Sequence, residues 1–184
     1  MNASRRILKI TLTSLFLWII LLFPLQATAQ PYGKGKYDEN VPYGSATSLT
    51  ISTTGNVAIQ ITPTDSGTLG TAVNTVTVSS TDVVGYDLYI RSLSSTDMTN
   101  GPYNLPASAN GLPAPLANNT WGYNTDASTD FVGMTLTDVL IKTLAGPATA
   151  GDNTAVTYGV KVDNNKPAGS YSTSIVYTAV PQTD

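Results

Sequence analysis

The chain has 184 residues, a length that suits one domain, and it contains neither histidine nor cysteine. Their absence excludes Ser-His-Asp and Cys-His catalytic triads, histidine-based metal sites, thiolate chemistry and disulfide bonds. The sequence has 9 Lys and Arg against 12 Asp and Glu, and three of the cations, Arg5, Arg6 and Lys9, precede the first apolar stretch. The rest of the chain therefore carries a net charge of about −6, which argues against nucleic acid and anionic lipid as partners.

The first 29 residues predict a secretory signal peptide. The three cations form its positive n-region, and an apolar stretch covers residues 12–25. Pro24 ends any helix there, and the small residues Ala27 and Ala29 are typical of a signal peptidase site, which predicts cleavage before Gln30. The alternative is an uncleaved membrane anchor, but a spanning helix needs about 20 apolar residues and this stretch is shorter. We therefore expect a secreted or extracellular protein, at most loosely associated with the cell surface.

Residues 30–46 predict a flexible entry segment ahead of the folded domain. No period of 2 or 3.6 residues runs through residues 30–44, and glycine and proline interrupt them repeatedly. The same segment contains three of the ten tyrosines of the chain, Tyr32, Tyr37 and Tyr43.

From residue 48 onward, apolar and polar residues alternate in short runs that predict half-buried strands. The expected strands lie at residues 49–51, 57–61, 76–78, 86–90, 131–136 and 139–144. A turn is expected at residues 55–56 and a loop at residues 63–70.

The two clearest alternating runs lie near the end of the chain. Val156, Val160 and Val162 share one phase of the first run, and the apolar phase of the second contains Tyr171, Ile175 and Tyr177. The residues between the runs, 164–169, contain proline and glycine. We expect a β-hairpin here, with those six side chains buried.

Residues 94–130 form a long excursion rich in Asn, Pro, Gly and Ser, with a short strand expected at residues 121–123. Together these elements give seven to nine strands with turn signals between them. The expected fold is all-β: a two-sheet antiparallel β-sandwich of the immunoglobulin-like kind, formed by a single domain at residues 47–181.

Three stretches, in order, resemble a known type of module. They are Thr75-Val76-Thr77-Val78-Ser79-Ser80 leading to Gly85-Tyr86-Asp87-Leu88, then Trp121-Gly122-Tyr123, then residues 156–162 followed by Pro167-Ala168-Gly169-Ser170-Tyr171 and residues 176–180. This ordered set is similar to an immunoglobulin-like β-sandwich module of bacterial secreted and cell-surface proteins. The resemblance implies the sandwich fold and a place outside the cell, and it supplies no catalytic residues.

Carboxylate and metal chemistry find little support in the sequence. Glycoside hydrolysis needs two carboxylates at a set separation, but Glu39 is the only glutamate and the aspartates are scattered. The phosphate-binding pattern G-x-x-x-x-G-K is missing. Calcium is the one cofactor worth weighing, with oxygen ligands at residues 118–130, 152–153 and 163–165. Their spacing matches no calcium loop, so turn-forming aspartates and amides are the preferred interpretation, and neither a catalytic residue nor a cofactor is predicted.

Aromatic residues remain as candidates for a recognition surface. Tyr89 lies on the phase opposite to the apolar residues of its strand, and Tyr103, Trp121 and Tyr123 lie in the excursion. Such rings could contact a protein partner or a glycan at the cell surface. The alternative, which we favour for Trp121, is structural packing, because Gly122 beside it suggests a close backbone approach.

The sequence therefore predicts a non-catalytic structural or interaction module of the adhesion type, with no enzymatic activity. The second hypothesis is a secreted carbohydrate-binding protein that uses the Tyr-, Trp- and Asn-rich loops.

Overall fold

The computed structural model of the protein describes residues 47–182. The predicted leader, its cleavage site and the entry segment lie outside this range. Within it the chain forms nine β-strands and no helix, so none of the described residues provides an apolar helix of membrane-spanning length.

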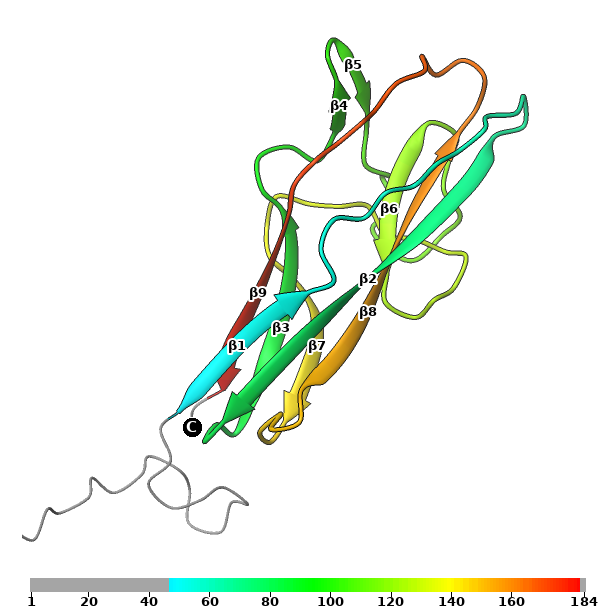
Figure 1. The fold of residues 1–184 in the computed structure, drawn as a ribbon. Coiled ribbons are helices and arrows are strands. Elements are labelled where there is room, and N and C mark those ends of the chain that lie inside the picture. The colour runs from blue at the N-terminus through cyan, green and yellow to red at the C-terminus, as the bar shows by residue number, and fades with distance from the viewer. Residues whose placement is uncertain (1–46, 183–184) are drawn as a thin grey trace, which may run out of the picture. The chain divides into compact units, whose positions relative to one another are not determined.

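The strands form two main sheets, and every ladder between named strands is antiparallel (Figure 1). The four-stranded sheet has the order β1 (Ser48–Thr53), β2 (Thr68–Thr81), β8 (Asp152–Val162) and β6 (Thr120–Asn124). The three-stranded sheet has the order β7 (Val139–Ala145), β3 (Gly85–Ser92) and β9 (Ile175–Gln182). A small separate hairpin joins β4 (Met98–Asn100) to β5 (Tyr103–Leu105). The expected two-sheet antiparallel sandwich is confirmed.

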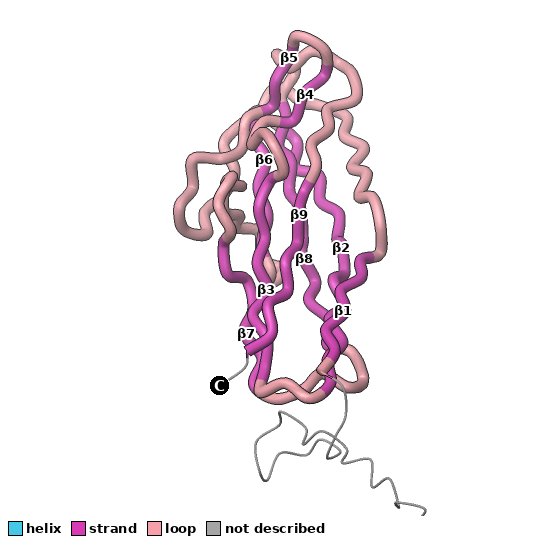
Figure 2. The backbone as a smooth tube through the Cα atoms, turned by 90° about the vertical axis from the view of Figure 1, so that its left-hand side faces the viewer, coloured by secondary structure: helices cyan, strands magenta, loops and turns pink. Residues whose placement is uncertain are grey.

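The core lies between the two sheets and comes from the alternating positions that the sequence indicated. Val76 and Val78 of β2 and Val156 of β8 are fully buried, as are Leu88 and Ile90 of β3. Successive side chains of a strand point to opposite faces, so one apolar phase per strand is enough to fill this interior. The start of β1 and the end of β9 lie at the same end of the sandwich (Figure 2).

The predicted hairpin near the C-terminus is wrong. β8 pairs with β2 and β6, whereas β9 pairs with β3 in the other sheet, so residues 163–174 cross between the sheets. The predicted phase nevertheless holds, since Val156 and Val160 are buried, while Val162, Tyr171, Ile175 and Tyr177 are half-buried against the core. The alternation of apolar and polar residues indicates which face of a strand is buried, but it does not indicate which strand lies beside it.

Two other predicted strands have no ladder. Residues 57–61 are outside any strand although their alternation is real, with Val57, Ile59 and Ile61 half-buried and Ala58 and Gln60 exposed. Residues 131–136 contribute only two isolated bridges, at Phe131 and Val132. In turn, β2 begins at Thr68, inside the loop expected at residues 63–70.

The excursion at residues 94–130 contains the β4–β5 hairpin, which the sequence did not indicate, and β6, which matches the predicted short strand. Backbone hydrogen bonds cover the outer edge of β6. Trp121 N donates to Pro106 O, Ser108 N donates to Trp121 O, and Tyr123 exchanges two bonds with Val132. This edge of the four-stranded sheet is therefore protected from further pairing.

Two glycines let the excursion pack closely on the outer face of this sheet. A Cβ at Gly122 would lie 2.5 Å from the Val132 carbonyl oxygen, and one at Gly159 would lie 2.5 Å from Cε1 of Phe131. Phe131 is fully buried there, on the side of the sheet away from the main core. The close approach expected at Gly122 is confirmed.

Candidate functional site

The four aromatic residues proposed for recognition lie in different environments. Trp121 is fully buried and Tyr123 is 5% exposed, both on β6, whereas Tyr103 at the start of β5 is 49% exposed. Tyr89 is half-buried on β3 in the other sheet. The Trp121 indole Nε1 donates to Thr96 O at 2.9 Å. The structure therefore leaves only Tyr103 well exposed among them, and Trp121 has the buried environment that its structural interpretation requires.

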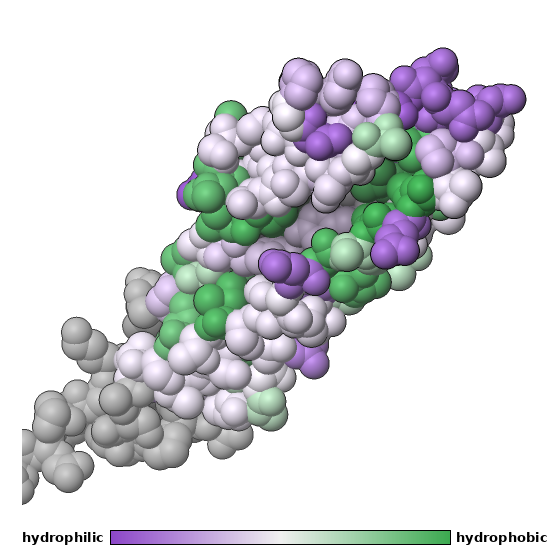
Figure 3. Space-filling model, turned by 45° about the horizontal axis from the view of Figure 1, so that its top comes forward, coloured by the Kyte–Doolittle hydropathy of each residue, from purple (hydrophilic) through white to green (hydrophobic). Residues whose placement is uncertain are grey.

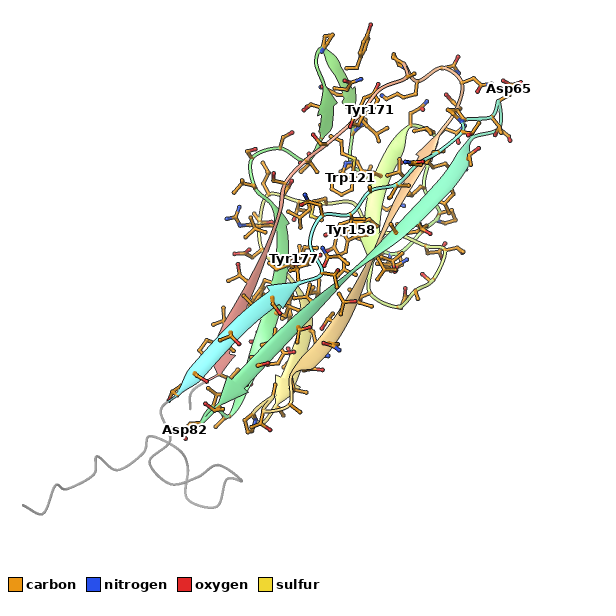
Figure 4. All side chains as sticks on the ribbon, in the orientation of Figure 1. Asp65, Asp82, Trp121, Tyr158, Tyr171 and Tyr177 are labelled. Carbon is orange, nitrogen blue, oxygen red and sulfur yellow. The ribbon has the colours of Figure 1, made fainter. Side chains whose placement is uncertain are left out.

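Aromatic side chains instead line up between the sheets (Figure 4). The rings of Trp121 and Tyr158 have centroids 6.4 Å apart, and the Tyr158 and Tyr177 hydroxyls are 2.7 Å apart, within hydrogen-bonding distance. Burial raises the pKa of both phenols above the ordinary value of 10.0. These residues are protonated near neutral pH and serve packing.

The carboxylate of Asp163, in one of the candidate calcium loops, is engaged by protein donors. Asp163 accepts hydrogen bonds from the Asn119 and Asn118 side chains and from the backbone N–H of Asn165. The bond from Asn119, followed by that from Asn165, lowers the pKa of Asp163 below its ordinary value. Such contacts fix a turn. Among the described residues, no group of three or more acidic side chains is arranged to hold a metal ion.

Asp152 has a different set of partners. Burial alone would raise its pKa, but hydrogen bonds from the Lys142 ammonium and the Tyr86 hydroxyl outweigh burial and lower it. The Lys142 Nζ lies 2.7 Å from Asp152 Oδ2. This ion pair connects β7 to β8, and thus one sheet to the other.

The described residues form an apolar groove of about 1080 Å³ on one side of the sandwich. One wall is formed by residues within 53–63, from the end of β1 onward, and the other by residues within 166–177, up to the start of β9. The base of the groove is formed by the core residues Trp121, Tyr158 and Val160. Their exposed fractions are only 0%, 6% and 8%. Hydrophobic residues gather on both sides of a hollow in this region (Figure 3).

The first wall is an extended segment without pairing. Within the described part of the chain, no group of residues 56–62 makes a hydrogen bond; the last bonds before it involve Thr54 and Gly55. Ile59 and Ile61 point toward β2, since a Cβ at Gly70 would lie 2.7 Å from Ile59 Cγ2 and 2.6 Å from Ile61 Cγ1. The wall thus has the side-chain pattern of a strand while its backbone donors and acceptors remain free for a partner.

The backbone of the second wall forms hydrogen bonds only on the side that faces away from the groove. Ser172 exchanges two backbone hydrogen bonds with Thr99, which lies in β4. In an extended chain, the backbone groups of the flanking residues point the opposite way. The structure gives no hydrogen bond to the backbone of Tyr171 or Thr173 from any residue it describes.

Sequence reasoning missed the groove because its two walls are more than 100 residues apart in the chain and meet only in the fold. One signal was present, however. Residues 45–64 contain no charged side chain, whereas exposed edge strands are commonly protected by Lys or other charges. An unprotected alternating segment beside an unpaired backbone indicates a contact surface.

Comparisons with protein families, with curated proteins and with solved structures found no match to the chain. The resemblance to a bacterial surface module therefore remains a prediction from sequence.

Proposed function

We propose that this chain is a non-catalytic interaction module of a secreted or cell-surface protein, and that it binds its partner in the apolar groove. The observation that supports this proposal is the unpaired, uncharged wall at residues 56–62. Unsatisfied backbone groups next to half-exposed apolar side chains favour a peptide partner, which supplies both hydrogen bonds and apolar contacts.

Carbohydrate binding receives less support. Sugar recognition by stacking requires an exposed aromatic face, but Trp121 and Tyr123 are buried in the sandwich. Tyr103 retains an exposed ring, and a single ring at a hairpin gives a small platform.

The test applies the exported protein to a glycan array and to a phage-displayed library of random peptides. We expect no sugar selectivity and enrichment of peptides that bind wild-type protein but not an Ala58→Arg variant. Ala58 is exposed on the groove wall, whereas Ala150 is an exposed alanine outside the groove. The matched Ala150→Arg variant should bind like wild type. Selective sugar binding, or peptides that tolerate Ala58→Arg, would contradict the proposal.

A further inference from the structure

The groove has the properties of a site for one additional β-strand. Residues 56–62 offer free backbone groups on one side, and Tyr171 and Thr173 offer them on the other. Between them lie the half-buried side chains of Val57, Ile59 and Ile61 on one wall and Tyr171, Ile175 and Tyr177 on the other. An inserted extended segment would hydrogen-bond to the walls and cover these apolar groups at once. A helix or a globular surface would leave the wall backbones unpaired.

The charge of the groove narrows the choice of strand. Lys166 is the only charged residue among the described residues that line it. Its Nζ donates to Asn104 O and lies 5.6 Å from the centroid of the Tyr171 ring, but it has no carboxylate partner in the described part of the chain. The matching strand is therefore apolar or aromatic at alternate positions, with one acidic residue among them.

Residues 37–43 of the chain fit that description. Although no period runs through residues 30–44 as a whole, these seven residues alternate: Tyr37, Val41 and Tyr43 share one phase, and Glu39, the only glutamate, occupies the remaining position of that phase. Seven residues in extended form span about 23 Å, which equals the length of a seven-residue wall at residues 56–62.

The length of chain between Tyr43 and Ser48 shows that the inserted strand must come from a second copy of the protein. Between Tyr43 and Ser48 a fully extended chain spans at most about 18 Å. β1 itself, at six residues, is about 20 Å long and lies between Ser48 and the groove. No residues are left for a turn, so residues 37–43 cannot align with residues 56–62 of the same copy.

We infer that residues 37–43 of one copy insert as a strand into the groove of a second copy, with Glu39 beside Lys166. The inference deepens the proposed function, on which it rests, by naming the partner. Because donor and acceptor surfaces differ, the contact is head-to-tail and builds open chains or closed rings of copies.

The absence of cysteine from the sequence makes disulfide trapping a clean test. Exported protein with Asn40→Cys is mixed under mild oxidation with protein carrying Ala58→Cys, because each position lies on the phase opposite to the apolar side chains of its own segment. We expect a disulfide-linked dimer, and a ladder of multiples from the double variant. The matched mixture of Asn40→Cys with Ala150→Cys should give no dimer above background. The inference would be overturned if the mixture with Ala58→Cys gave no dimer. It would also be overturned if the double variant formed its disulfide only within a single chain.

A charge exchange tests the same contact without a covalent bond. Sedimentation equilibrium of the exported protein should show a mass that rises with concentration. Glu39→Lys should weaken this association at least ten-fold, and Glu39→Lys combined with Lys166→Glu should restore it. An association constant that is the same in the wild type and in both variants would contradict the inference. If displayed peptides bind the groove while the cysteine mixture gives no dimer, the interaction module stands and only the assignment of a second copy fails.

Discussion

The hydroxyl groups of Tyr158 on β8 and Tyr177 on β9 lie 2.7 Å apart and hydrogen-bond to each other across the interior of the sandwich. The two strands are consecutive main-sheet strands in the chain but belong to opposite sheets. The bond therefore joins the two sheets next to the base of the groove.

Removing one of these hydroxyls should be costly because the other is left buried without its partner. We expect Tyr158→Phe to lower the free energy of unfolding by about 1–3 kcal/mol. The double variant with Tyr177→Phe should cost less than the sum of the single changes, which a double-mutant cycle in urea would measure. Tyr103→Phe at an exposed position should change stability by less than about 0.5 kcal/mol. Additive single changes would show that the two hydroxyls do not interact.

The same pair predicts loss of stability at alkaline pH. Burial raises the pKa of Tyr158 and Tyr177 above 10.0, so the folded state favours the protonated phenols. Their contribution is fully present below pH 10.0, the ordinary value for the unfolded chain, and is lost as the pH rises toward the folded pKa values. Chemical unfolding between pH 8 and about 12 should show this decline, with a shallower slope in Tyr158→Phe. Equal slopes would contradict it.

Trp121 should behave as a core residue in solution. It is fully buried, and its indole N–H is satisfied by Thr96 O. Trp121→Ala should lower the free energy of unfolding by about 3–5 kcal/mol, as large-to-small aromatic core changes do. Its emission in protein that begins at Gln30, and so lacks Trp18, should be blue-shifted and poorly quenched by iodide. Red emission with efficient quenching and an unchanged melting temperature would place the ring at the surface instead.

The packing of Phe131 over β8 makes Gly159 sensitive to added volume. A Cβ there would lie 2.5 Å from one ring carbon of Phe131 and 2.6 Å from another. We expect Gly159→Ala to cost about 1–3 kcal/mol by overpacking, measured by urea unfolding. Gly111→Ala is the matched control because a Cβ at Gly111 meets nothing within 4 Å. If both variants unfold alike, Phe131 does not seal this face of the sheet.

Acid should weaken the turn that Asp163 holds. Its hydrogen bonds lower the folded pKa below 3.8, so its stabilisation is present above pH 3.8 and disappears as the pH falls through the folded value. Asn119→Gly removes the main donor but accommodates the positive φ of 62° at this position. NMR titration of the Asp163 carboxyl carbon should show a pKa below 3.8 in the wild type and a higher one in Asn119→Gly. A wild-type pKa at or above 3.8 would contradict the assigned hydrogen bonds.

Several features of the fold could be predicted from particular residues. The phase of Val76 and Val78, and of Leu88 and Ile90, correctly identified their buried faces. Gly122 indicated the close approach beside Trp121. The groove could not be predicted, because residues 57–61 have the same alternation as a paired strand. Only the tertiary structure, through the positions of β2 and residues 166–177, shows that the backbone of residues 57–61 has no partner.

By itself the sequence determined the class of the fold and the side of each strand that is buried. Both are local properties, since consecutive side chains of an extended chain point to opposite faces whatever lies beside them. Only the tertiary structure decided that β8 and β9 lie in opposite sheets, that the excursion covers β6, and that one wall of the groove remains unpaired. These depend on hydrogen bonds between residues distant in the chain, whose register is set by packing and connection geometry rather than by the alternation of either partner.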